Sequence, residues 1–156
     1  MLRNFLIVAI FTLFFAGCKS YVPPVENLDL VKEKTFQADY EKVWSALVQW
    51  YAENDMSIDL LEKESGLIRT EWFKPCEQCK DCGFMKYNEK WEASVRVRIN
   101  MILIKKNDGS CILTINQSYK EVPFSFGGRP VILGYVECFS NGLYEYEIFE
   151  YIDEKL

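Results

Sequence analysis

The chain has 156 residues, a formal net charge of −5, 49% hydrophobic and 15% aromatic residues, and no histidine. This size and aromatic content fit one globular domain with a hydrophobic core. The acidic balance argues against binding to nucleic acid, because affinity for phosphates requires clustered Lys and Arg. The lack of histidine excludes Ser-His-Asp and Cys-His catalysis and removes the commonest metal ligand. We therefore expect a protein that is not an enzyme and carries no cofactor.

The N-terminal stretch MLRNFLIVAIFTLFFAGCKS has the layout of a secretory signal. Arg3 precedes an apolar run over 5–16, which is shorter than the about 20 residues that a membrane-spanning helix needs. The FAGC sequence that ends at Cys18 resembles the lipobox of bacterial lipoproteins, with Phe in place of the usual Leu. The resemblance implies that residues 1–17 are removed and that Cys18 becomes an acylated N-terminus held in the lipid bilayer.

Lys19 follows this cysteine, and no Asp stands there. By resemblance to the sorting rule of Gram-negative lipoproteins, this implies the outer membrane. The domain is then expected to face the periplasm, with the cell surface as the alternative. Residues 18–31 contain Pro23 and Pro24 and no periodic pattern, which is typical of a partly extended tether. We expect 32–156 to form a single domain.

The clearest element comes next. A short extended piece over 33–38 leads to Asp39, a favourable helix N-cap. Helical spacing of the apolar residues then predicts an amphipathic helix of about four turns that ends near Asn54; the residues at this spacing are Val43, Trp44, Leu47, Val48 and Tyr51. Residues 58–73 predict a β-hairpin with its turn near Gly66.

Residues 91–104 predict a long strand with strict alternation. One face is apolar and comprises Trp91, Ala93, Val95, Val97, Ile99, Met101 and Leu103. The other face contains Arg96 and Arg98, which we interpret as solvated, with anion binding as the alternative. A turn signal at 107–110 leads into a returning strand from Cys111, whose apolar face also includes Leu113 and Ile115.

The C-terminal part is predicted as three segments. The stretch PFSFGGRP at 123–130 is expected to form an irregular loop, VILGYVECFS at 131–140 a last strand, and 141–156 a helix with acidic residues near its start. The complete order of elements favours an α+β fold. We expect an antiparallel sheet of five to six strands with an N-terminal and a C-terminal helix packed on one face.

The run FQADYEKVWSALVQWYAENDMSIDLLEKESGLIRTEW resembles a recurrent pattern in small outer-membrane lipoproteins, and CFSNGLYE resembles their C-terminal pattern. The element order is similar to the helix-grip, or TBP-like, domains of the BamC-like accessory lipoproteins of the outer-membrane β-barrel assembly machinery. Those proteins contain two such domains, whereas this chain has room for one. The resemblance implies a helix-grip fold and a role accessory to outer-membrane assembly.

Five cysteines remain once Cys18 is lipidated: Cys76, Cys79, Cys82, Cys111 and Cys138. The periplasm is oxidising, so disulfides are expected, and an odd count leaves at least one cysteine outside the intrachain pairs. Cys111 lies on the apolar face of a predicted strand and is our candidate free thiol. The family resemblance implies a Cys82–Cys138 bridge, because DCG and ECFS look like paired landmarks, and Cys76 would then pair with Cys79.

Other uses of these cysteines remain open. Cys76, Cys79, Cys82 and Cys138 would offer four thiolates to Zn²⁺, although three of them crowd one loop. An iron–sulfur cluster also uses the C-x₂-C-x₂-C spacing, normally in a reducing compartment. A redox-active C-x-x-C pair would require a helix N-terminus, and no helix signal follows Cys79 or Cys82.

We therefore expect a membrane-anchored, non-enzymatic protein-binding or scaffold module whose partner is another envelope protein. One alternative is a carrier of small apolar ligands, with a cavity between the helix at 40–54 and the strand at 91–104. Another alternative is a metal or redox module built on Cys76, Cys79 and Cys82. The sequence leaves the oligomeric state open.

Overall fold

The computed structural model describes residues 21–26, 29–85, 95–120, 122–124 and 134–156. Cys18, the predicted signal segment, Trp91 and Ala93 lie outside the described residues, as does most of the predicted loop at 123–130.

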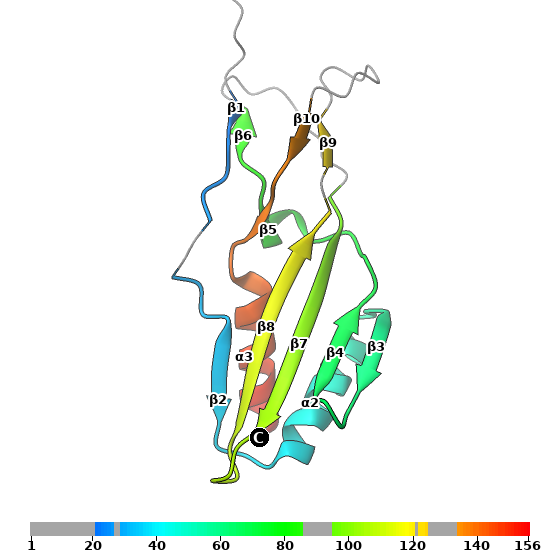
Figure 1. The fold of residues 1–156 in the computed structure, drawn as a ribbon, viewed down its shortest axis with the longest axis vertical. Coiled ribbons are helices and arrows are strands. Elements are labelled where there is room, and N and C mark those ends of the chain that lie inside the picture. The colour runs from blue at the N-terminus through cyan, green and yellow to red at the C-terminus, as the bar shows by residue number, and fades with distance from the viewer. Residues whose placement is uncertain (1–20, 27–28, 86–94, 121, 125–133) are drawn as a thin grey trace, which may run out of the picture.

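Five antiparallel strands form the main sheet, in the order β2-β8-β7-β4-β3 (Figure 1). Their bounds are Glu33–Phe36 for β2, Ile58–Glu62 for β3, Leu67–Thr70 for β4, Val97–Lys105 for β7 and Cys111–Tyr119 for β8. β7 and β8 pair along all nine of their residues. The predicted hairpin is formed by β3 and β4, and the alternation of β7 buries Val97, Ile99, Met101 and Leu103 as expected.

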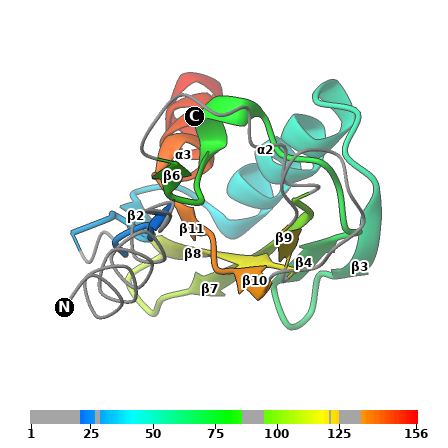
Figure 2. The same cartoon turned by 90° about the horizontal axis from the view of Figure 1, so that it is seen from above.

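Two helices cover one face of this sheet, α2 over Tyr40–Glu53 and α3 over Leu143–Lys155 (Figure 2). The side chain of Asp39 accepts a hydrogen bond from the backbone N–H of Glu41 at 2.9 Å, so the predicted N-cap is confirmed. No helix among the described residues is both long enough and apolar enough to cross a membrane.

The core lies between the helices and the inward face of the sheet. It joins side chains from α2, α3, β4, β7 and β8, and its least exposed members include Val43, Leu47, Ile68, Ile99, Leu113, Ile115, Ile148 and Ile152. Burying these faces together is the main stabilising contribution, because apolar area removed from water gives about 25 cal/mol per Å². The α+β class, the antiparallel sheet with five strands and the two helices are confirmed.

Three short strand pairs lie outside the main sheet. β1 (Tyr21–Val22) pairs with β6 (Phe84–Met85), β5 (Lys80–Asp81) with β11 (Phe139–Ser140), and β9 (Val122–Phe124) with β10 (Gly134–Val136). The pairs β1–β6 and β9–β10 lie beyond one end of the main sheet (Figure 1). Part of the predicted tether, Tyr21–Val22, is therefore paired with the domain.

Two predictions for the C-terminal part were wrong. Pro123 and Phe124 belong to strand β9 and not to an irregular loop. In place of the predicted last strand at 131–140, the described residues from 134 to 140 form two short strands, β10 and β11, whose partners are in different two-stranded sheets. Apolar content indicated strand correctly, but the choice of partner depends on where distant segments lie, and the local pattern does not contain that information.

Candidate functional site

Two disulfides join the cysteine-rich loop to itself and to the residue that precedes β11. Cys76 is bonded to Cys79, and Cys82 is bonded to Cys138 across a sequence separation of 56. These are the pairs that the sequence analysis favoured. The short 3₁₀ helix η1 (Glu77–Cys79) lies inside the smaller ring.

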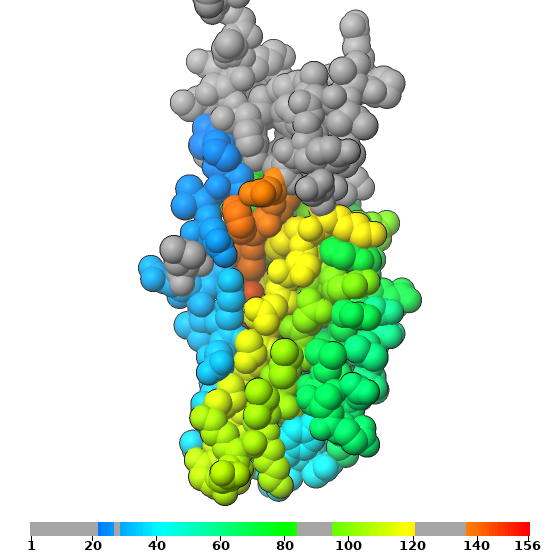
Figure 3. All heavy atoms as spheres, in the orientation of Figure 1, coloured from blue at the N-terminus to red at the C-terminus, as the bar shows by residue number. Residues whose placement is uncertain are grey.

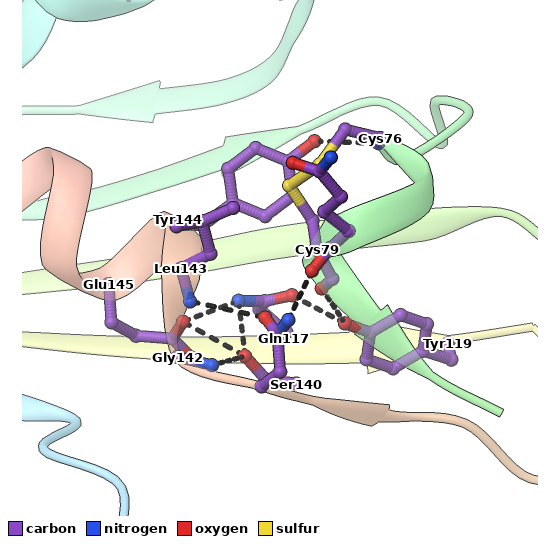
Figure 4. Close-up of a disulfide and its surroundings, with 11 residues drawn as sticks. Cys76, Cys79, Gln117, Tyr119, Ser140, Gly142, Leu143, Tyr144 and Glu145 are labelled. Carbon is purple, nitrogen blue, oxygen red and sulfur yellow. Dashed lines mark hydrogen bonds between the residues drawn. A yellow bond between two sulfur atoms is a disulfide. The ribbon is translucent and has the colours of Figure 1, made fainter. Parts of the chain in front are cut away.

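Hydrogen bonds fasten the same loop to α3 (Figure 4). The backbone N–H of Cys76 donates to the hydroxyl of Tyr144 at 3.3 Å, and the amide of Asn141 donates to the carbonyl oxygen of Gln78. The ring of Tyr144 meets that of Phe73 edge-on, with centroids 6.0 Å apart. The loop and the first turn of α3 therefore form one packed unit.

A buried carboxylate lies under this unit. Glu145, in the first turn of α3, is 1% exposed. Its Oε2 accepts hydrogen bonds from Gln117 Nε2 at 2.7 Å and from Ser140 Oγ at 2.9 Å (Figure 4). Ser140 Oγ also accepts from the backbone N–H of Gly142 at 3.0 Å. Sequence reasoning missed this network, since it joins β8, β11 and α3, whose contact only the fold creates.

The network continues to the disulfide loop through Tyr119. Its hydroxyl lies 2.7 Å from Gln117 Oε1 and 3.3 Å from the carbonyl oxygen of Cys79. Burial raises the pKa of the Tyr119 phenol, and the carboxylate of Glu145 adds to the rise. The phenol therefore stays protonated as a hydrogen-bond donor. The adjoining cavity is only about 70 Å³, so it has room for water or a small ion and not for an organic substrate.

Cys111 is the free cysteine among the described residues, and it is fully buried. Its Sγ lies 3.5 Å from the carbonyl oxygen of Ala38. Burial raises the pKa of this thiol, and the Asp39 carboxylate adds to the rise. Both effects keep the thiol protonated, which disfavours a reactive nucleophile.

The metal and redox alternatives receive little support from this geometry. Cys76, Cys79, Cys82 and Cys138 have their sulfur atoms bonded to one another, so they do not form a thiolate set. Among the described residues, no group of three or more His, Cys, Asp or Glu side chains is placed to bind a metal ion. Cys79 ends a 3₁₀ helix of three residues, which lacks the N-terminal environment that lowers a thiol pKa.

The space between α2 and β7, where an apolar-ligand cavity was considered, is filled by side chains. Val43 and Leu47 of α2 and Ile99 and Met101 of β7 are all 0% exposed. A depression of about 650 Å³ lies at one end of this interface, but it is open to solvent and polar side chains line much of it; these include Asp39, Glu41, Lys63 and Glu64. The described residues therefore give no support to an enclosed carrier site.

The sheet face opposite the helices has a different character. We call it the open face, and Figure 3 views it directly. At one end two cations lie close to the ring of Trp72: Arg98 Cζ is 4.7 Å from the ring centroid and Lys120 Nζ is 4.8 Å from it. Arg96 Nη1 lies 3.5 Å from the carbonyl oxygen of Trp72.

Sequence reasoning found only part of this surface. Arg96 and Arg98 were identified from the alternation of their strand, but Trp72 and Lys120 were not connected to them. The register brings them together, because Phe73 pairs with Val97 and Lys120 N–H bonds to the carbonyl oxygen of Arg96. These pairings join segments far apart in sequence.

No model of a known protein family matches the chain, and no curated protein matches it in sequence.

Proposed function

We propose that this chain is a membrane-anchored, non-enzymatic lipoprotein of the bacterial cell envelope whose α+β domain serves as a protein-binding or scaffold module. Cys18 would hold the chain in the outer membrane, with the domain facing the periplasm. The observation that carries the proposal is the pair of disulfides, because structural disulfides form and persist in oxidising compartments such as the periplasm.

The character of the site supports a binding role over a chemical one. The buried polar network around Glu145 joins β8, β11 and α3, and its cavity is too small for an organic substrate. The free thiol is buried and remains protonated. A binding role would instead use the exterior of the domain. On the open face, cationic side chains surround Trp72 and isoleucine side chains are exposed.

The proposal extends to the fold family. A five-stranded antiparallel sheet with two helices on one face is the layer order expected of a helix-grip domain. A role accessory to outer-membrane assembly follows from the BamC-like resemblance in the sequence. It is part of the proposal because fold by itself does not assign function.

Lipid labelling and cross-linking in a Gram-negative host would test this function. We expect the full-length chain to incorporate a palmitate probe and to fractionate with the outer membrane, whereas Cys18→Ser loses both. Cys111→Ser is the matched control and should keep both. In-cell cross-linking should then join the wild-type chain to another envelope protein. A soluble, unlabelled wild type would overturn the anchor, and cross-links to no protein at all would overturn the scaffold role.

A further inference from the structure

The open face of the main sheet divides into two chemically distinct halves. We define the basic cluster as Arg69, Arg96, Arg98 and Lys120 around Trp72. We define the apolar strip as Leu67, Ile102, Ile104 and Ile112. Pairing in the sheet places Ile102 between Leu67 and Thr114, and Ile104 opposite Ile112, so the strip is continuous across β4, β7 and β8.

The basic cluster contains more positive charge than the described carboxylates around it neutralise. Asp59 Oδ2 lies 2.9 Å from Arg69 and 3.6 Å from Arg98, and it is the carboxylate that pairs with the cluster among the described residues. Arg96 and Lys120 are exposed and form no ion pair within the described part of the chain. In a chain with a net charge of −5, this concentration of cations on one face is distinctive.

The apolar strip exposes large apolar side chains at positions where the solvent-facing side of a sheet usually has polar residues. Ile104 is 52% exposed and Ile102 is 36% exposed. No described helix or loop covers this half, as the space-filling view shows (Figure 3). Contiguous exposed apolar side chains beside a charged area are typical of interaction surfaces.

The face has the size of a small interface. Its two central strands have nine residues each, whereas β2, β3 and β4 have four or five. At about 3.3 Å per residue and about 4.8 Å between strands, the five strands present a projected area of about 500 Å². This is below the about 800 Å² that each partner buries in a standard interface and is typical of a weak, transient one.

A second copy of the chain, docked through this same face, would leave the basic cluster without carboxylates to bind. A two-fold dimer brings identical patches together. With the axis near Trp72, the cations of one copy would face those of the other. With the axis at the centre of the face, the basic cluster would meet the apolar strip, and neither half would gain a complementary surface.

An anionic bilayer is also a poor match. The basic cluster would be attracted, but the rest of the chain carries excess negative charge and would be repelled by anionic lipid. A protein segment can instead place a few carboxylates locally, without a charged plane beneath the whole domain. Charge complementarity therefore favours a protein over a membrane.

From these observations we infer that the open face docks a protein segment that presents carboxylates to the basic cluster and apolar side chains to the apolar strip. This inference rests on the proposed function and supplies the chemistry of the partner. Arg98 and Ile102 are four residues apart and Arg98 and Ile104 six, so the two groups of the partner segment should be separated by about 13–20 Å. The planar guanidiniums suit carboxylates, which they bind through paired N–H donors.

The test uses the full-length chain in nanodiscs of zwitterionic lipid, labelled for NMR at the isoleucine methyl groups and at the tryptophan indole N–H groups. Two synthetic peptides of equal length share one leucine pattern, and one carries Glu and the other Lys at every charged position. We expect the acidic peptide to shift the methyl signals of Ile102, Ile104 and Ile112 and the indole signal of Trp72. The core methyl groups of Ile148 and Ile152 are internal controls and should stay unchanged.

Two variants locate the interaction. Arg96→Glu combined with Lys120→Glu should weaken binding of the acidic peptide by about ten-fold or more. Both side chains are exposed, and among the described residues their interactions are with Trp72. Lys42→Glu changes charge by the same amount per site on the exposed surface of α2 and should leave binding unchanged. Added salt should weaken the wild-type interaction and leave little effect on the double variant.

Each other outcome overturns the inference. Equal binding of both peptides would mean non-specific apolar adsorption. No shift at up to about 1 mM acidic peptide would mean that the face is not a docking site of this kind. Shifts of Ile102 and Ile104 on moving to anionic nanodiscs, with no peptide present, would identify lipid as the occupant. The proposed function is tested separately, by lipidation and cross-linking. A protein partner that cross-links to another surface of the domain would support the proposed function and overturn the docking surface inferred here.

Discussion

At the scale of single residues, Gly66 in the β3–β4 turn occupies a position where both the backbone angle and the available space favour glycine. Its φ is +70°, in the left-handed region that favours glycine. Its carbonyl oxygen accepts a hydrogen bond from the N–H of Leu103 at 2.9 Å. A Cβ at this position would lie 2.0 Å from the carbonyl oxygen of Leu103, and that atom belongs to the rigid backbone of β7.

Gly66→Ala is therefore expected to lower the free energy of unfolding by about 3 kcal/mol or more, through backbone strain combined with a steric clash. Gly109→Ala is the matched control, because Gly109 also has a positive φ, of +86°, but a Cβ there would meet no atom within 4 Å. We expect it to cost only about 1–2 kcal/mol. Urea denaturation followed by circular dichroism measures both values. Equal losses would show that the close approach of Leu103 is not the cause.

At the scale of elements, some helices and strands are specified by nearby residues, whereas others depend on pairing with distant segments. The helix at Tyr40–Glu53 and the hairpin around Gly66 were predictable, because N-cap, periodicity and turn signals all lie within a few residues of the element that they specify. The end at 131–140 was not predictable in the same way. There β10 and β11 pair with β9 and β5, and the Cys82–Cys138 bridge stands beside these pairings.

The two disulfides should contribute unequally to stability. The chain-entropy model gives about 4 kcal/mol for a bridge that closes the loop between Cys82 and Cys138, and about 2 kcal/mol for the short Cys76–Cys79 ring. We therefore expect the double variant Cys82→Ala/Cys138→Ala to lose more free energy of unfolding than Cys76→Ala/Cys79→Ala. Parallel urea titrations of the two variants against wild type measure the difference. A larger loss for the short ring would show that the loop's local fold, and not loop closure, dominates.

At the scale of the whole molecule, one face of the sheet is closed by two helices and the other is presented to the surroundings. The closed side concentrates tyrosines whose phenols are protected from water. Burial raises the pKa of Tyr51, Tyr119 and Tyr144 above the ordinary value of 10.0. The folded state therefore keeps protons that the unfolded chain loses at alkaline pH.

This difference predicts alkaline destabilisation with a definite sign. Below about pH 9 the phenols are protonated in both states and do not affect stability. Above pH 10 the unfolded chain binds fewer protons than the folded one, so the free energy of unfolding falls, by up to about 1.4 kcal/mol per pH unit for each tyrosine. Urea titrations at several pH values, together with tyrosinate absorbance, measure the slope.

Tyr51→Phe is the informative variant for this prediction. The Tyr51 hydroxyl is buried and has no hydrogen-bond partner among the described residues, so its removal should cost little at neutral pH. The variant should show a shallower loss of stability above pH 10 than wild type. An unchanged slope would place the alkaline transition at other groups.

The sequence by itself determined the elements and faces that depend on neighbouring residues. The alternation from Val97 to Leu103 specified an inward and an outward face, and Asp39 specified where α2 begins. The layout of the N-terminal segment and the lipidation expected at Cys18 belong to the same class of inference and remain predictions. Such patterns are readable because a strand repeats every two residues and a helix every 3.6.

Only the tertiary structure decided which distant side chains meet. Glu145 is joined to Gln117 and Ser140, and Trp72 contacts Arg98 and Lys120, because the fold brings these segments together. The physical reason is that a register is set by burial of the whole sheet face, and a shift of one residue would reverse every side chain along a strand. The chemistry of the open face is therefore a property of the fold, although each of its residues was visible in the sequence.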